Sequence, residues 1–232
     1  MAAVARAGPM DGRVPHLRRW KLTDVVAHLG GVHRWAAGIA AARAWTGAGH
    51  RRGRAHGDAL IEWFEEGLAE LVSVLATADL DATCPNFSPG SPATVGFWAR
   101  RQAHETTMHR WDAESVAGSL TPIDPELATD GIDEMLTVFR RTRGGQQLAA
   151  PVRLVTSDTG AAWRVSPADR PGRVEIAAGD DAAGATGATG ATVRAPAEAL
   201  LLAVWGRCPI DGPAFRVTGR GELARAFLPG PR

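Results

Sequence analysis

Apolar residues recur at three- and four-residue steps through the first part of the chain, which is the spacing of amphipathic helices. Aspartate at 58 is an expected N-cap, and Ser91-Pro92 and Asp124-Pro125 are expected helix starts. The Gly144-Gly145 pair would close the last of these helices. The pattern therefore predicts helices over residues 22–42, 58–79, 91–118 and 124–143.

Beyond residue 145 the apolar pattern shortens to strand-like runs separated by turn residues. Residues 179–191 are an Ala/Gly/Thr tract with few large side chains to pack, and we expect a loop there. We predict an α+β chain with a helical bundle over residues 1–145 and a small α/β domain over residues 146–232. The predicted strands are 152–156, 162–165, 174–176, 192–194 and 215–217, with helices over 196–205 and 222–228.

Composition excludes several classes of function. The chain is 45% hydrophobic and 22% charged, and it holds no apolar run of the roughly 18 residues that a membrane span needs. With 26 basic and 25 acidic residues, it has no overall field for nucleic acid. The first residues lack the apolar core of a secretory signal, so we expect a cytoplasmic protein. Cys84 and Cys208 are too few for a disulfide framework.

Three side chains form a candidate metal site. Glu105 and His109 are four residues apart on a predicted helix, so they share one face. His28 falls on the apolar face of the first long helix. Together they give two imidazoles and a carboxylate, the set that leaves zinc a fourth position for water or substrate. The alternative is an exposed Glu105–His109 pair that only stabilises its helix.

Other residues leave the chemistry open. Asp112, three residues after His109, is either a hydrogen-bond acceptor for a ligand imidazole or a solvated charge. We interpret the remaining histidines as surface or packing residues, and the eight tryptophans as packing. No phosphate-binding Gly-rich loop and no G-x-S-x-G elbow is present, which argues against nucleotide and serine-hydrolase chemistry.

Two segments, DVVAHLGGVHRW at 24–35 and FWARRQAHETTMHRWDAE at 97–114, resemble the mycothiol-dependent maleylpyruvate isomerase family of the DinB-like superfamily. ATVRAPAEALLLAVWGR at 191–207 is similar to that family's small C-terminal α/β domain. The resemblance implies a DinB-like four-helix bundle. Family members usually begin with a long helix, and in departing from that pattern this chain is expected to keep only residues 1–8 of it, either because the start is misassigned or because the bundle lacks this helix. The resemblance also implies zinc, or another divalent metal, on His28, Glu105 and His109, with mycothiol as the thiol.

The resemblance further implies that Arg207 holds an anionic substrate, although this arginine could equally cap a helix C-terminus. The expected activity is thiol-adduct cis/trans isomerisation or thiol S-transfer on a small electrophile. A non-catalytic, metal-containing small-molecule binder is the alternative. Partners would be a small substrate and a low-molecular-weight thiol, without nucleic acid or membrane, and the sequence leaves monomer or homodimer open.

One departure from the family pattern concerns the start of the helix that carries His28. The usual Pro-Gly-Trp-Ser/Thr entry is Arg18-Arg19-Trp20-Lys21 in this chain, which replaces a hydroxyl N-cap with lysine. Loss of such a cap costs about 1 kcal/mol. The cost would be avoided if Thr23 capped the helix instead.

Overall fold

The computed structural model describes residues 1–232 except 18, 48, 141–147, 170–172, 180–189 and 232. The chain forms two compact units, Met1–Thr121 and Pro122–Arg232. The sequence placed this boundary later, between residues 145 and 146. The difference arises because α5 (Pro125–Glu134), assigned from the sequence to the bundle, packs against α6 (Ala197–Val204) of the second unit.

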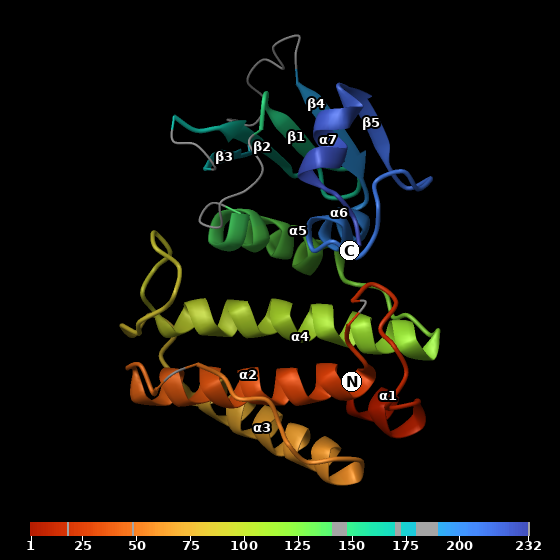
Figure 1. Cartoon of the computed structure of the whole chain (residues 1–232). Coiled ribbons are helices and arrows are strands. Elements are labelled where there is room, and N and C mark those ends of the chain that lie inside the picture. Colours follow the sequence, from red (N-terminus) through yellow and green to blue (C-terminus); the bar gives the residue numbers. More distant parts are fainter. Residues whose placement is uncertain (18, 48, 141–147, 170–172, 180–189, 232) are drawn as a thin grey trace. The chain divides into compact units, whose positions relative to one another are not determined.

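The N-terminal unit is helical, as predicted. Its long helices are α2, α3 and α4, and α2 packs against both of the others (Figure 1). The short α1 packs against all three. Buried apolar side chains from α1 to α4, including Leu29 and Phe64, form the core. The bounds are α1 Ala2–Ala7, α2 Leu22–Ala42, α3 Asp58–Thr77 and α4 Val95–Ala117.

The start of α2 is capped differently from the expectation. Lys21 is the N-cap residue, and its backbone N–H donates to the carboxylate of Asp24 at 2.9 Å. Thr23 does not cap, because its hydroxyl donates to the carbonyl oxygen of Met10 at 2.6 Å. A carboxylate in the first turn also favours the positive end of the helix dipole, so Asp24 offsets part of the missing hydroxyl cap.

The starts of α3 and α4 also differ in detail. Gly57, with a φ of 56°, precedes α3, so Asp58 is its first residue rather than its cap. Helix α4 begins at Val95, later than the Ser91-Pro92 signal. An antiparallel bridge between Thr83 and Thr94 holds the preceding segment extended, which delays the helix.

The loop after α2 folds back along that helix, and Gly31 makes room for it. A Cβ on Gly31 would lie 2.1 Å from the carbonyl oxygen of Arg51, so no other residue fits without a shift. The Gly53 N–H donates to the carbonyl oxygen of Ala27 at 3.1 Å, which ties the loop to the first half of α2. This path carries His50 toward the middle of the helix.

The C-terminal unit is a five-stranded sheet with helices, in the order β3-β2-β1-β4-β5. Strands β1 and β4 are parallel, with Leu154 opposite Val193, and the other pairs are antiparallel. The α+β class is therefore confirmed. The strands are β1 Val152–Thr156, β2 Ala162–Pro167, β3 Val174–Ala178, β4 Ala191–Ala195 and β5 Arg216–Gly219, and the last helix is α7 Gly221–Phe227.

The start and end of α5 and the tract at 179–191 can also be compared with the predictions. Asp124 caps α5 as expected, because its carboxylate accepts from two backbone N–H groups at 3.0 Å. The helix continues as a π-helical segment, Met135–Arg140, and the rest of the predicted 124–143 helix lies outside the described residues. Most of the tract predicted to be a loop, 179–191, also lies outside them. Among the described helices, none combines the length and the apolar character needed to cross a membrane.

Candidate metal centre

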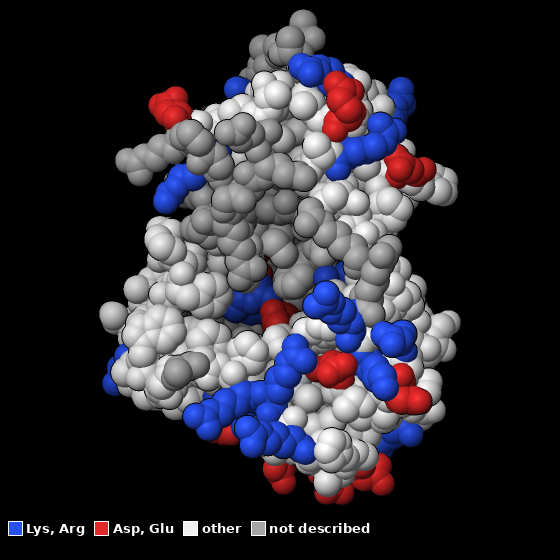
Figure 2. Space-filling model, viewed as in Figure 1, with Lys and Arg blue, Asp and Glu red and all other residues white. Residues whose placement is uncertain are grey.

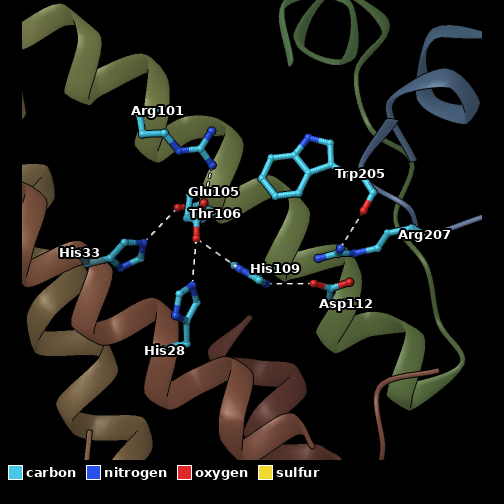
Figure 3. Close-up of polar contacts among 9 residues, drawn as sticks. All are labelled: His28, His33, Arg101, Glu105, Thr106, His109, Asp112, Trp205 and Arg207. Atoms are coloured by element: carbon cyan, nitrogen blue, oxygen red, sulfur yellow. Dashed lines mark hydrogen bonds and ion pairs between the residues drawn. The ribbon is translucent and has the colours of Figure 1, made fainter. Parts of the chain in front are cut away.

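Helices α2 and α4 bring the three predicted ligands together (Figure 3). The Nε2 atom of His28 lies 3.0 Å from Oε1 of Glu105, and Nε2 of His109 lies 3.3 Å from the same oxygen. One donor atom from each residue lies within 4.8 Å of the other two, and no other such group of His, Cys, Asp or Glu occurs among the described residues. The alternative of an exposed pair is wrong, because the side chains of His109 and Glu105 are only 6% and 13% exposed.

The spacing of these atoms fits a small divalent cation. Two ligands of a tetrahedral zinc ion with bonds of about 2.0–2.1 Å lie about 3.3–3.4 Å apart. The two imidazole nitrogens lie 3.0 and 3.3 Å from Oε1 of Glu105, which is close to that separation. Two imidazole nitrogens and one carboxylate oxygen are donors that zinc accepts. The residues therefore fit the metal that the sequence predicted, and they leave one coordination position without a protein ligand.

Asp112 supports one of the ligands. Its carboxylate is fully buried and lies 2.9 Å from Nδ1 of His109. A proton on Nδ1 leaves Nε2 of His109 free to face a cation, as is usual for metal-bound histidines. Burial lowers the pKa of His109, but hydrogen bonds with Asp112 and Glu105 raise it to about 9. Of the two roles that the sequence left open for Asp112, the structure selects the hydrogen-bond acceptor.

Arg101 was not predicted, and it completes the charge balance of the site. Its guanidinium pairs with Oε2 of Glu105 from one helical turn earlier on α4. Burial would raise the pKa of Glu105, but hydrogen bonds with His109 and His28, together with the charge of Arg101, hold it well below its usual 4.5. The carboxylate is thus ionised and available as a ligand. The signal in the sequence was an arginine four residues before the proposed Glu ligand.

Several rings surround the three ligands. The Trp20 ring stacks on His109, with centroids 5.8 Å apart, and His50 approaches His28 edge-on at 4.9 Å. His33 is fully buried, with Nε2 3.0 Å from the Thr106 hydroxyl, and burial lowers its pKa to about 4. Of the two roles that the sequence left open for this histidine, surface or packing, burial fits packing. His50 was not predicted to lie beside the ligands, because its position depends on the folded-back loop.

Arg207 lies in the C-terminal unit, just after α6. Its guanidinium donates to the carbonyl oxygen of Trp205, the C-cap residue of α6, at 2.9 Å. This bond is the helix-capping role that the sequence left open. A role in binding substrate stays a prediction.

Charged side chains of both signs lie at the surface of each unit. On the face drawn in Figure 2, acidic side chains lie among the basic ones on each unit, as the formal charge of +1 leads one to expect.

Two models of protein families match the chain. The mycothiol maleylpyruvate isomerase N-terminal domain matches residues 1–114, and the C-terminal domain of the same family matches residues 126–226. The chain belongs to this family. Its two matched segments correspond to the two compact units, with the gap between the models spanning the boundary at residues 121 and 122.

Solved structures agree on the fold. The crystal structure of the mycothiol-dependent maleylpyruvate isomerase is similar with a TM-score of 0.60 at 13% identity, covering 94% of this chain and 86% of that one. A histidine-to-alanine mutant of a mycothiol-dependent maleylpyruvate isomerase gives a TM-score of 0.57 at 13% identity, covering 88% and 82%. No curated protein matches the chain.

Proposed function

We propose that the chain is a mycothiol-dependent metalloenzyme that acts on a small electrophilic substrate, by thiol-adduct cis/trans isomerisation or by thiol transfer. The observation that carries the proposal is the convergence of His28, Glu105 and His109 on one point between two helices of a family fold. Zinc is the metal we propose, because two imidazole nitrogens and one carboxylate oxygen are donors that it accepts.

The residues of the site have separate tasks in this proposal. His28, Glu105 and His109 would hold the cation, and Asp112 keeps the Nε2 lone pair of His109 directed inward. Arg101 keeps Glu105 ionised and oriented. A bound divalent cation supplies Lewis acidity, which lowers the pKa of a coordinating thiol. Arg207 is the proposed partner for a substrate carboxylate, a role that bidentate guanidinium geometry suits.

The proposed reaction balances without a further reagent. The thiolate sulfur adds to one carbon of a cis double bond conjugated to a carbonyl, and the electron pair moves onto the carbonyl oxygen as an enolate. Rotation about the new single bond follows, the carbon–sulfur bond breaks, and the trans alkene and the thiolate are restored. In thiol transfer the enolate takes a proton instead, and the sulfur stays attached.

Elemental analysis of the purified protein tests the metal. We expect about one zinc per chain, and a loss of most of it in His28→Ala and Glu105→Gln. His56→Ala, which removes an exposed imidazole outside the site, should retain it. A protein that contains no divalent metal, and whose melting temperature is unchanged when zinc is added, would refute the proposal.

Turnover separates the remaining alternatives. The metal-loaded protein is incubated with mycothiol and maleylpyruvate, and the products are followed by NMR. Appearance of the trans isomer supports isomerisation, and a stable conjugate supports thiol transfer. Tight binding of the thiol with neither product would instead support the non-catalytic binder.

A further inference from the structure

A cluster of aromatic side chains lies where the second half of α2, the loop after it, the segment between α3 and α4, and the start of α4 meet. We define the aromatic shelf as Trp35, Trp45 and Phe87. Trp98 lies beneath it, fully buried, with its ring 4.9 Å from that of Trp35 at an interplanar angle of 88°. The rings of Trp45 and Phe87 are nearly parallel to that of Trp35, at 24° and 17°.

The shelf is exposed to an extent that core packing does not explain. Trp45 is 51% exposed and Phe87 is 40% exposed, and they are the two aromatic residues among the exposed large hydrophobic side chains described. Burying apolar surface lowers the free energy of a protein in proportion to the area removed from water. Two large solvent-exposed rings that adjoin a buried ring are therefore typical of a binding surface.

The indole nitrogen of Trp35 strengthens this interpretation. It is shielded from solvent and has no hydrogen-bond partner among the described residues. The neighbouring Trp98 shows the ordinary case, with its indole N–H donating to the carbonyl oxygen of Pro85 at 2.9 Å. A buried N–H without an acceptor is costly, and such groups are rare enough in folded proteins to require an explanation.

The His50 ring lies between the shelf and the metal centre. Trp35 follows His28 by seven residues on α2, and Trp98 precedes Glu105 by seven on α4. Seven residues are two helical turns, or about 10 Å. The His50 ring fills the interval, with centroids 4.9 Å from His28 and 6.1 Å from Trp35. Ring contacts through His50 therefore connect the metal centre to the shelf within the N-terminal unit.

We propose that the aromatic shelf binds a flat apolar group of the substrate, and that this enzyme acts on unsaturated keto acids that carry an aryl substituent. The proposal rests on the proposed function, because the reacting carbon must lie at the metal centre. Aromatic faces stack on flat apolar groups. An aryl-substituted keto acid is a narrower substrate class than membership of the family indicates.

Binding of unreactive ligands tests the shelf without turnover. The zinc-loaded protein is titrated by calorimetry with 4-oxo-4-phenylbutanoate and with 4-oxopentanoate, which share the keto acid but differ in phenyl against methyl. Neither ligand has a double bond to isomerise. We expect the phenyl ligand to bind about tenfold more tightly, as burial of one ring predicts.

Trp45→Ala and Phe87→Ala should each bring the two affinities to within about threefold, because each removes ring surface from the shelf. Val72→Ala, an exposed apolar residue on α3, should keep the full preference and is the control. Equal affinities in the unaltered protein, or a preference that survives both shelf variants, overturn the proposal. A preserved phenyl preference in a protein with no turnover would instead refute the proposed reaction and keep the shelf as a binding site.

Discussion

Replacement of His33 by leucine should make the protein less sensitive to acid. His33 is fully buried between α2 and α4, and burial lowers its pKa from 6.5 to about 4. As the pH falls below 6.5, the unfolded chain binds a proton at this histidine while the folded chain does not. Stability from the neutral imidazole is therefore present above pH 6.5 and is lost as the pH falls toward 4.

The magnitude follows from the two pKa values. The fall from 6.5 to about 4, converted at about 1.4 kcal/mol for each pH unit, amounts to about 3 kcal/mol in the free energy of unfolding. Below about pH 4 the folded protein binds the proton as well, and the difference stops growing. The same loss should be absent in His33→Leu, whose side chain does not titrate.

Urea denaturation of the metal-free protein, in the presence of a chelator, measures this difference. The free energy of unfolding is determined between about pH 7.5 and pH 4 for the unaltered chain, for His33→Leu and for His56→Leu, an exposed histidine that serves as the control. The other titrating groups are common to all three proteins and cancel in the comparison. Parallel pH profiles for the unaltered chain and His33→Leu would refute the argument from burial.

The remaining predictions concern the hydrogen bond between Asp112 and His109 and the packing of α2. Asp112→Asn should weaken zinc binding about 10- to 100-fold in a competition titration with a chelator, because it removes the charge that orients His109; an unchanged affinity would contradict that role. Gly31→Ala should lower the free energy of unfolding by more than about 2 kcal/mol, since the new Cβ would meet the Arg51 carbonyl. Gly38→Ala has room, with its nearest neighbour at 3.4 Å, and should stabilise α2 by up to about 1 kcal/mol in the same denaturation assay. A similar loss in both glycine variants would show that the close approach is not the cause.

Local periodicity was enough to predict the long helices, whereas the choice of His28, Glu105 and His109 as metal ligands also needed the family resemblance. The 3.6-residue repeat places Glu105 and His109 on one face and His28 on an apolar face, and packing of α2 on α4 then brings them together. The sequence also indicated most of the strands, because their apolar runs are bounded by turn residues. These features depend on neighbours close in the chain.

Features that depend on distant segments could not be predicted in this way. Helix α4 begins late because of the bridge between Thr83 and Thr94, and the unit boundary moves to residue 121 because α5 packs on α6. The place of His50 beside His28 follows from a loop that folds back over Gly31. Each of these features depends on a tertiary contact, which the spacing of residues along one element does not predict.

All three candidate metal ligands lie on two helices of the N-terminal unit, and this has a consequence for synthesis on the ribosome. The chain acquires its last ligand at His109, and the helical unit ends at Thr121, before any strand of the second unit has been made. Metal uptake can therefore accompany the folding of the first unit while translation continues. A nascent chain arrested after this unit has emerged from the ribosome should already retain zinc.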